Sequence, residues 1–521
     1  MIGFNEAAIY ESFDVETPEI LKNNYSIWRL MIDKRYQGRG YGREAIRLAL
    51  DFIKSWPCGK AEYCALSYEP ENEVGAKLYH SLGFVENGEM DGDEIVAVLK
   101  LSIKKTNIKG ENNMKQTILR KYARLIARVG VNIQKGQDVI IGCDLDQPKF
   151  VALLVDECYK AGARKVKVEF DYQPLEKLHV RHQSVSTMAK VEDWEKARLQ
   201  HYVDTLPCRI YLVSEDPDGL KGINQKKMAK ASQKRYPIVK PYWDTMENKY
   251  QWCIAAVPGA AWAKKLFPEL PKGRAIEKLW EAILFTSRVT EDPVAAWEAH
   301  DKDLHERCAY LNSLGIAELR YKGDNGTDLT VGMIPEAEFK GGGDRTKDRG
   351  VFFNPNIPTE ECFISPMRGK AEGIVYATMP LSYQGQLIEN FSVRFEKGKA
   401  VEVKAEKNQA LLEQMISMDE GAAYLGECAL VPVNSPIAES GILFYETLFD
   451  ENAACHLALG AGFADTIKGF ESMTLEECRA LGINESMEHV DFMIGYEGLD
   501  IDAVTREGKT VPIFRRGKWA F

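Results

Sequence analysis

The middle of the chain alternates between short apolar segments and longer amphipathic ones. The apolar runs are Asp138–Gly142, Lys165–Phe170, Arg209–Val213 and Cys253–Val257. The segments between them have the spacing of helices, and a further helical pattern starts at Met114. Strands that alternate with helices are typical of a largely parallel sheet covered by helices. The pattern therefore predicts an α/β layer from Met114 to about Arg288.

The pattern changes from Ile316 onward, where strand-like runs follow one another closely. Two pairs of runs flank a short glycine-containing turn: Glu318–Tyr321 with Leu329–Val331 around Asn325-Gly326, and Phe391–Phe395 with Ala400–Val403 around Lys397-Gly398. Glycine accepts the positive φ that a tight hairpin turn requires. The last third of the chain is therefore predicted to be a β-rich α+β domain.

A polar segment separates the beginning of the chain from these two regions. Residues 102–113 read SIKKTNIKGENN and lack a sustained hydrophobic period, which is typical of a linker. A chain of 521 residues is also too long for one ordinary core. We therefore expect a multidomain protein of α/β and α+β class, with a small module at 1–101, a linker at 102–113, an α/β domain at 114–300 and a β-rich α+β domain at 301–521.

Composition narrows the class of function. The net charge of -10 argues against a dedicated nucleic-acid binder, which needs a basic face. No uncharged apolar run has the length of a membrane span, and the first residues lack the basic start of a secretory signal. Eleven cysteines without a CxxC pair indicate reduced thiols rather than disulfides. We expect a cytoplasmic protein that acts on small molecules or peptides, with no nucleic-acid or membrane partner.

A glycine-rich loop stands near the N-terminus, between a strand-like run at Ile27–Ile32 and a helical segment at Arg43–Ser55. The loop residues are Gln37, Gly38, Arg39, Gly40, Tyr41 and Gly42. Glycines before a helix allow backbone N–H groups to approach a phosphate, and the helix dipole favours its charge. A plain tight turn remains an alternative interpretation.

Together with Asn72, Tyr79 and Gly83-Phe84, this loop resembles the coenzyme-binding half of the GNAT N-acetyltransferase family, over residues 1–101. The resemblance implies that Gln37–Gly42 holds the pyrophosphate of acetyl-coenzyme A, that Asn72 contacts the coenzyme and that Tyr79 is a general acid. The family's first strand and two following helices have no counterpart in this sequence. Acetyl transfer, coenzyme binding without turnover and a structural remnant therefore stay open as alternatives.

The C-terminal third contains residues suited to metal binding. His456 and His489 are the only histidines after His305. His489 and Asp491 lie two apart in a strand-like segment, so both point to one face; a solvated sheet face is the alternative. His456 stands in an apolar segment, where a satisfied core histidine is the alternative.

Two glutamates complete the candidate set. Glu361 follows a proline-stiffened segment, and Glu427 lies between apolar residues. Carboxylates are seldom buried without a cation. Two glutamates, two histidines and one aspartate form a nitrogen and oxygen donor set suited to Zn, Co or Mn. Five donors exceed one tetrahedral site and fit a pair of divalent ions that share a bridging carboxylate and a water.

Five segments resemble the thermophilic metalloaminopeptidase family, which includes aminopeptidases T, S and PepS, from about Met114 to Phe521. They are GTDL (326–329), NIPTEE (356–361), LGE (425–427), HLALG (456–460) and HVDFMIG (489–495). The resemblance implies two divalent ions bound by Glu361, Glu427, His456, His489 and Asp491. It also implies a homodimer that removes N-terminal residues from peptides. Phe463 departs from the family, where a tyrosine that helps to stabilise the reacting oxygen is common.

The favoured function is therefore a metal-dependent aminopeptidase in which two ions activate a water, with Glu427 as bridging ligand or catalytic base. One rival hypothesis is that N-acetyltransferase activity is an additional or the main function. Another is that coenzyme binding by the first module regulates assembly of the larger part.

Overall fold

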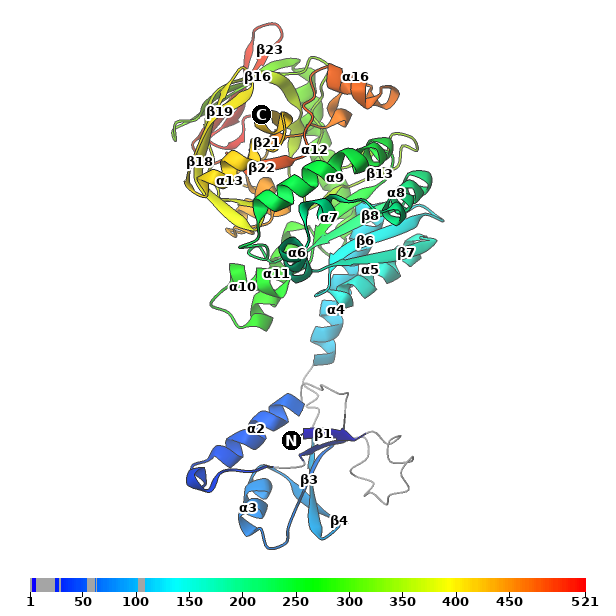
Figure 1. The fold of residues 1–521 in the computed structure, drawn as a ribbon, viewed down its shortest axis with the longest axis vertical. Coiled ribbons are helices and arrows are strands. Elements are labelled where there is room, and N and C mark those ends of the chain that lie inside the picture. The colour runs from blue at the N-terminus through cyan, green and yellow to red at the C-terminus, as the bar shows by residue number, and fades with distance from the viewer. Residues whose placement is uncertain (1, 6–23, 28–29, 54–60, 62, 102–107) are drawn as a thin grey trace. The chain divides into compact units, whose positions relative to one another are not determined.

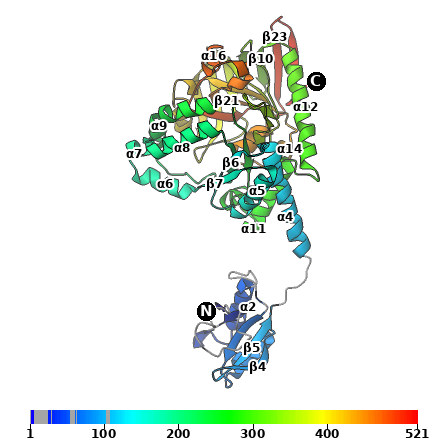
Figure 2. The same ribbon diagram turned by 90° about the vertical axis from the view of Figure 1, so that its right-hand side faces the viewer.

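The computed structural model describes residues 2–5, 24–27, 30–53, 61, 63–101 and 108–521 (Figures 1 and 2). The chain divides into two compact units, Met1–Asn113 and Met114–Phe521. The mixed α/β architecture expected from the sequence is confirmed. Among the described residues, no helix is both long and apolar enough to cross a bilayer.

In its described part, the first unit contains a sheet of order β1-β2-β3-β5-β4 and the helices α2 and α3. Its elements are β1 (Ile2–Asn5), β2 (Asn24–Ile27), α2 (Tyr41–Ile53), β3 (Tyr63–Tyr68), α3 (Glu73–Ser81), β4 (Val85–Asp91) and β5 (Glu94–Lys100). Strands β2 and β3 are parallel, and the other pairs are antiparallel. Ile46, Leu50 and Ile53 of α2 are buried, and they pack in one core with β3 and β5.

The strand predicted at Ile27–Ile32 lies earlier, because β2 ends at Ile27. Residues 28–29 lie outside the described part. The short helix η2 (Lys34–Tyr36) follows, and its N-cap Asp33 accepts a hydrogen bond from the backbone N–H of Arg35 at 2.9 Å. The chain therefore turns before the glycine loop instead of continuing as a strand.

The second unit begins with an entirely parallel sheet of order β14-β9-β8-β6-β7. Its strands are β6 (Asp138–Asp144), β7 (Lys165–Asp171), β8 (Cys208–Val213), β9 (Trp252–Ala256) and β14 (Asn356–Ile357). The four strands predicted from the apolar runs are confirmed. The fifth, β14, comes from much later in the chain and leads directly to the segment that contains Glu361.

Helices connect and cover these strands. They are α4 (Ile108–Leu125), α5 (Pro148–Ala161), α6 (Gln173–His182), α7 (Val185–Ala189), α8 (Asp193–Thr205), α9 (Gln225–Met246), α10 (Ala260–Leu266), α11 (Lys272–Thr286) and α12 (Pro293–Ser313). Helix α4 begins six residues before Met114, where the sequence pattern places its start. Residues 108–113 of the predicted linker are therefore helical, and residues 102–107 lie outside the described part.

The remainder of this unit is β-rich. A nine-stranded sheet contains the two predicted hairpins, β10 (Ile316–Gly323) with β11 (Asp328–Met333) and β18 (Gln386–Glu396) with β19 (Lys399–Lys407), which are confirmed as antiparallel pairs. It also contains β16 (Pro366–Tyr376), β17 (Leu381–Tyr383), β23 (Leu499–Thr505), β24 (Thr510–Arg515) and β25 (Lys518–Trp519). A separate four-stranded sheet has the order β15-β20-β21-β22.

The sequence predicts reduced cysteines, and the described part of the chain contains no disulfide. The ten cysteines in the described part of the chain are all buried and free, while Cys58 lies outside it. Buried unpaired thiols behave as small apolar side chains.

Candidate metal centre

The predicted metal ligands share one face of the four-stranded antiparallel sheet. Its strands are β15 (Cys362–Ile364), β20 (Leu425–Leu430), β21 (His456–Gly460) and β22 (His489–Met493), and Glu361 directly precedes β15. The prediction that His489 and Asp491 lie on a strand is confirmed. Residues that face each other across antiparallel strands point to the same side of the sheet.

The strand register aligns the five side chains. Ala458 pairs with Glu427 on one side and with Asp491 on the other. His489 pairs with Gly460 in the same row of alternate residues. Because Ala458 and Gly460 are small, they leave room above the sheet in which the longer side chains converge.

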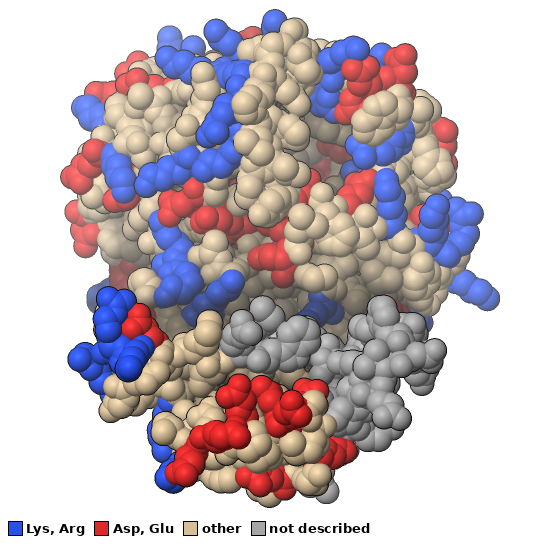
Figure 3. Space-filling view, turned by 60° about the horizontal axis from the view of Figure 1, so that its bottom comes forward, with Lys and Arg blue, Asp and Glu red and all other residues tan. Residues whose placement is uncertain are grey.

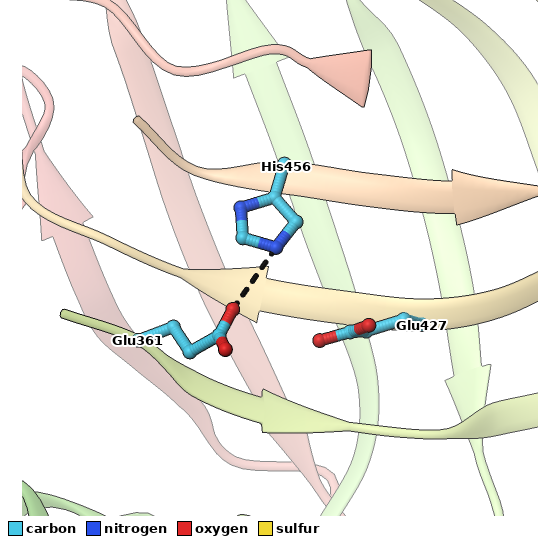
Figure 4. A group of neighbouring side chains, drawn as sticks. All are labelled: Glu361, Glu427 and His456. Atoms are coloured by element: carbon cyan, nitrogen blue, oxygen red, sulfur yellow. Dashed lines mark ion pairs between the residues drawn. The ribbon is translucent and has the colours of Figure 1, made fainter. Parts of the chain in front are cut away.

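The structure brings the five side chains together as two overlapping groups. Glu361, Glu427 and His456 form one, and Glu427, His489 and Asp491 form the other, with donor atoms within 4.8 Å of one another in each. In the first group His456 Nε2 lies 3.1 Å from Glu361 Oε2, and the Glu427 carboxylate points toward this pair (Figure 4). In the second, His489 Nε2 lies 3.0 Å from Glu427 Oε2 and 3.2 Å from Asp491 Oδ1.

Backbone carbonyls orient both imidazoles. His456 Nδ1 lies 3.2 Å from the carbonyl oxygen of Ala454, and His489 Nδ1 lies 2.7 Å from that of Ala461. A hydrogen bond donated by Nδ1 leaves the Nε2 lone pair facing the carboxylates. This second contact is the one that metal-binding histidines usually make. The donor set therefore fits a divalent metal.

The electrostatics of this buried cluster also favour a cation. Burial raises the pKa of Glu427 to about 7, although His489 opposes the shift. Burial would lower the pKa of His456, but Glu361 and the other carboxylates raise it to about 9. Burial would raise the pKa of Asp491, yet His489 and His456 lower it. The carboxylates thus attract positive charge, which either protons or metal ions can supply.

A sixth side chain, the fourth acidic one, joins this cluster and is absent from the predicted set. Glu451 is 9% exposed, lies on the 3-10 helix η5 (Glu451–Ala453) and is close enough to Asp491 for the two carboxylates to repel each other. Burial, followed by repulsion from Asp491, Glu361 and Glu427, raises its pKa well above the usual range. The available sequence signal is the acidic pair Asp450-Glu451 just before an apolar segment, which by itself does not distinguish a ligand from a helix end.

A hydrogen-bonded network ties the segment of Glu361 to that of Glu451. The backbone N–H of Glu360 donates to Asn452 Oδ1 at 2.7 Å. The Glu360 carboxylate forms a bidentate ion pair with Arg288, with Nη2 2.8 Å from Oε2. Both residues are largely buried, so the carboxylate of Glu360 is already neutralised and is not available as a ligand.

The cluster opens into a cavity of about 580 Å³. Phe463 lies in its wall, and its ring is 4.7 Å from that of His489 and 5.7 Å from that of Phe363. The Phe463 backbone N–H donates to Ser365 Oγ at 2.8 Å, which fixes this segment beside β15. A molecule in the cavity would therefore contact both the donor groups and an aromatic wall.

The residues predicted to bind acetyl-coenzyme A lie in the first unit. Gly38 and Gly40 have φ of 74° and 86°, so the loop needs glycine at both positions, and α2 begins within the predicted loop, at Tyr41. Gln37 donates to the carbonyl of Ile32 at 2.9 Å. Arg39 lies over the ring of Tyr36, and a group of Lys and Arg side chains is visible on the surface of this unit in Figure 3.

Asn72 and Tyr79 occupy the next helix. The Asn72 side-chain oxygen accepts the backbone N–H of Gly75 at 2.9 Å and so caps the N-terminus of α3. The half-buried Tyr79 ring packs 5.5 Å from Tyr68. Burial and the nearby Glu94 raise the pKa of Tyr79, which keeps its hydroxyl protonated at neutral pH.

Comparisons with known proteins agree with this division. Residues 2–84 match the acetyltransferase (GNAT) family. A stretch of 94 residues, which is 18% of this chain, is 29% identical to a spermine/spermidine N(1)-acetyltransferase of Bacillus subtilis and covers 57% of that protein.

The larger part of the chain matches a peptidase family. It is 42% identical to aminopeptidase AmpS of Bacillus subtilis over 407 residues, which is 77% of this chain and 98% of that protein. The solved structure of wild-type AmpT from Thermus thermophilus is similar, with a TM-score of 0.70 and 38% identity, and the match covers 78% of this chain and 100% of that one. Residues 115–519 match the model of the thermophilic metalloproteases (M29). The chain therefore belongs to the thermophilic metalloprotease family M29.

Proposed function

We propose that this protein is a metal-dependent aminopeptidase that uses two divalent ions, Zn, Co or Mn. The observation that carries the proposal is the pair of overlapping donor groups that share Glu427. Glu361, Glu427 and His456 would hold one ion, and Glu427, His489 and Asp491 the other. Such a shared carboxylate is the usual feature of a two-metal hydrolytic site.

The position of Glu451 supports a further role for it. Its carboxyl group lines the same cavity as Asp491 and interacts with it electrostatically, and no ion pair with a described lysine or arginine neutralises it. We propose Glu451 as a sixth ligand, which donates oxygen to the ion that Asp491 holds. Carboxylate oxygens suit Zn, Mn and Co alike, so this donor does not select among the three.

Bound ions would activate a water as the nucleophile and stabilise negative charge that develops on the peptide carbonyl. Glu427 faces both groups of donors, and we assign it one of two roles: the ligand that bridges the ions, or the base that takes the proton from the water and delivers it to the leaving amine. The carbonyls of Ala454 and Ala461 hold the two imidazoles in place throughout. The aromatic wall at Phe463 shields one side of the site from water.

Exopeptidase specificity follows from the excess of acidic groups. A free α-amino group is a cation at neutral pH, and the eight carboxylates that line the cavity outnumber its three imidazoles, Lys340 and Arg345 together. The aminopeptidase names of the relatives point the same way. We further propose that the protein acts as a cytoplasmic homodimer on peptides with a free N-terminus.

The test is hydrolysis of unblocked dipeptides and amino acid anilides by the purified protein. We expect chelation to abolish activity and Zn, Co or Mn to restore it. N-acetylated peptides should resist cleavage, because they lack the amino cation. Full activity after chelation, or equal cleavage of blocked and free peptides, would refute the proposal.

A second function is supported by the first unit. The positive-φ glycines before α2 offer backbone N–H groups and a helix N-terminus to a pyrophosphate. We propose that Gln37–Gly42 and Asn72 bind acetyl-coenzyme A and that Tyr79 would be the acid if acetyl transfer occurs. The match covers only part of the acetyltransferase relative. We therefore propose peptide hydrolysis as the main function and acetyl transfer as a second one.

A further inference from the structure

The cavity beside the candidate metal centre contains a lysine that the aminopeptidase chemistry does not use. Lys340 lies in its wall together with Glu361, Phe363 and Phe463. Lys340 and Phe363 form an isolated antiparallel bridge, with N···O distances of 2.8 and 2.7 Å in the two directions. Directly bridged residues point to the same side, and alternate residues along a strand share a face. Lys340 therefore lies on the same face as Phe363 and Glu361.

The surroundings leave the Lys340 ammonium available to a ligand. Its Nζ lies 5.7 Å from the centre of the buried Phe470 ring, which also lines the cavity. Within the described part of the chain, no carboxylate lies within the 4.0 Å of an ion pair with it.

Asp344 and Asp465 interact electrostatically with Lys340, and both face the same cavity. Burial raises the pKa of Asp344, and Lys340 opposes this shift. Burial and repulsion from Asp344 raise the pKa of Asp465 to about 7, again against the effect of Lys340. The two aspartates are thus close enough to interact with the ammonium but do not contact it.

We propose that Lys340 binds the C-terminal carboxylate of a short peptide, so that the site favours dipeptides and tripeptides over longer chains. This inference rests on the proposed aminopeptidase function. Lys340 stands opposite Phe363, two residues from Glu361, or roughly 7 Å along the strand at ~3.3 Å per residue. The terminal carboxylate of a dipeptide or tripeptide lies about 4 to 7 Å beyond the scissile carbonyl, at ~3.6 Å per residue.

Two matched substrates distinguish carboxylate binding by Lys340 from a general effect of its substitution on activity. Leu-Gly carries the terminal carboxylate, whereas Leu-Gly amide presents the same scissile bond without that charge. For the unaltered protein we expect a lower KM for the free acid. Lys340→Gln should raise the KM for the acid roughly tenfold, which corresponds to about 1.4 kcal/mol. It should leave kcat/KM for the amide nearly unchanged, and Lys340→Arg should retain the preference for the acid.

The results that would refute carboxylate binding by Lys340 differ from those that would refute the aminopeptidase function. Equal KM values for acid and amide in the unaltered protein, or an equal change for both substrates in Lys340→Gln, would show that Lys340 does not bind the carboxylate. If Lys340→Gln does not fold, the ratio of the KM values for acid and amide still tests the inference. That ratio can be measured in the unaltered protein and in Lys340→Arg. Absence of hydrolysis of both substrates by the metal-loaded protein would instead reject the aminopeptidase proposal.

Discussion

At the scale of single residues, the site depends on which atom of each histidine is free. His456 and His489 both place Nδ1 against a backbone carbonyl and Nε2 against carboxylates. The tautomer required for metal binding is therefore fixed by the main chain rather than by other side chains. Substitutions that preserve the main chain should leave the two imidazoles in place.

Phe463 provides the first prediction. Its ring packs beside His489 in the cavity wall, where the resemblance implies a tyrosine in related proteins. A hydroxyl on this ring would offer a hydrogen bond to a developing oxyanion, an interaction worth up to ~3 kcal/mol in a dry site. We expect Phe463→Tyr to raise kcat by at least severalfold with unchanged metal content. An unchanged kcat would show that another donor already stabilises the oxyanion.

The second prediction concerns how the stability of the protein and its affinity for metal depend on pH. Because the pKa of His456 rises from 6.5 to about 9 on folding, the metal-free folded protein binds more protons than the unfolded chain in this window. Its stability should therefore fall as pH rises from about 6.5 to 9. Metal ions compete with these protons, so their affinity should rise over the same range.

Thermal unfolding with and without Zn measures both effects. We expect the metal-free midpoint to fall between pH 6.5 and pH 9, and the increase caused by Zn to be larger at pH 8.5 than at pH 6. A Zn effect that is constant or decreases with pH would contradict the proposed role of the two imidazoles.

At the scale of elements, the antiparallel register determines which side chains meet. Ala458 stands in the row between Glu427 and Asp491, and it is fully buried. We expect Ala458→Leu to separate these carboxylates and to reduce bound metal and kcat/KM by tenfold or more, as measured by elemental analysis and peptide hydrolysis. Leu457→Ile is the control, because Leu457 points to the opposite face of β21 and a volume-conserving change is usually tolerated. Equal metal content in the two variants would argue against the assigned face.

Some elements of the fold can be predicted from local sequence signals, and others depend on tertiary contacts. Apolar runs predict β6 to β9 and their parallel arrangement, and glycine turns predict the two hairpins, because these signals are local. The period of two places His489 and Asp491 on one face. Strand β14 has two residues and no pattern of its own, so its parallel pairing with β9 depends on tertiary contacts. Glu451 is absent from the predicted set for the same reason, since its interaction with Asp491 is non-local.

At the scale of the whole molecule, two units with different chemistry share one chain. We expect the first unit to bind acetyl-coenzyme A but to acetylate poorly, because its match covers only 57% of the acetyltransferase relative. Losing the alignment of an amine with the thioester costs rate far more than coenzyme affinity. Calorimetry measures the binding, and a thiol-release assay measures the transfer.

Two glycines allow a matched test of that binding. Gly40 and Gly88 both have φ of 86° and open space around the position of a Cβ, but only Gly40 belongs to the proposed coenzyme loop. Alanine should strain both positions similarly. We expect Gly40→Ala to weaken coenzyme binding about tenfold and Gly88→Ala to leave it nearly unchanged. Equal binding by both variants would remove the loop from the proposed site.

Anomalous X-ray scattering from crystals grown with Zn or Mn would show whether two ions share Glu427. We predict two peaks about 3.5 to 4 Å apart, one beside Glu361 and His456 and the other beside His489 and Asp491, with Glu427 between them. A single peak, or two peaks away from Glu427, in crystals of active protein would contradict a two-ion site that shares Glu427.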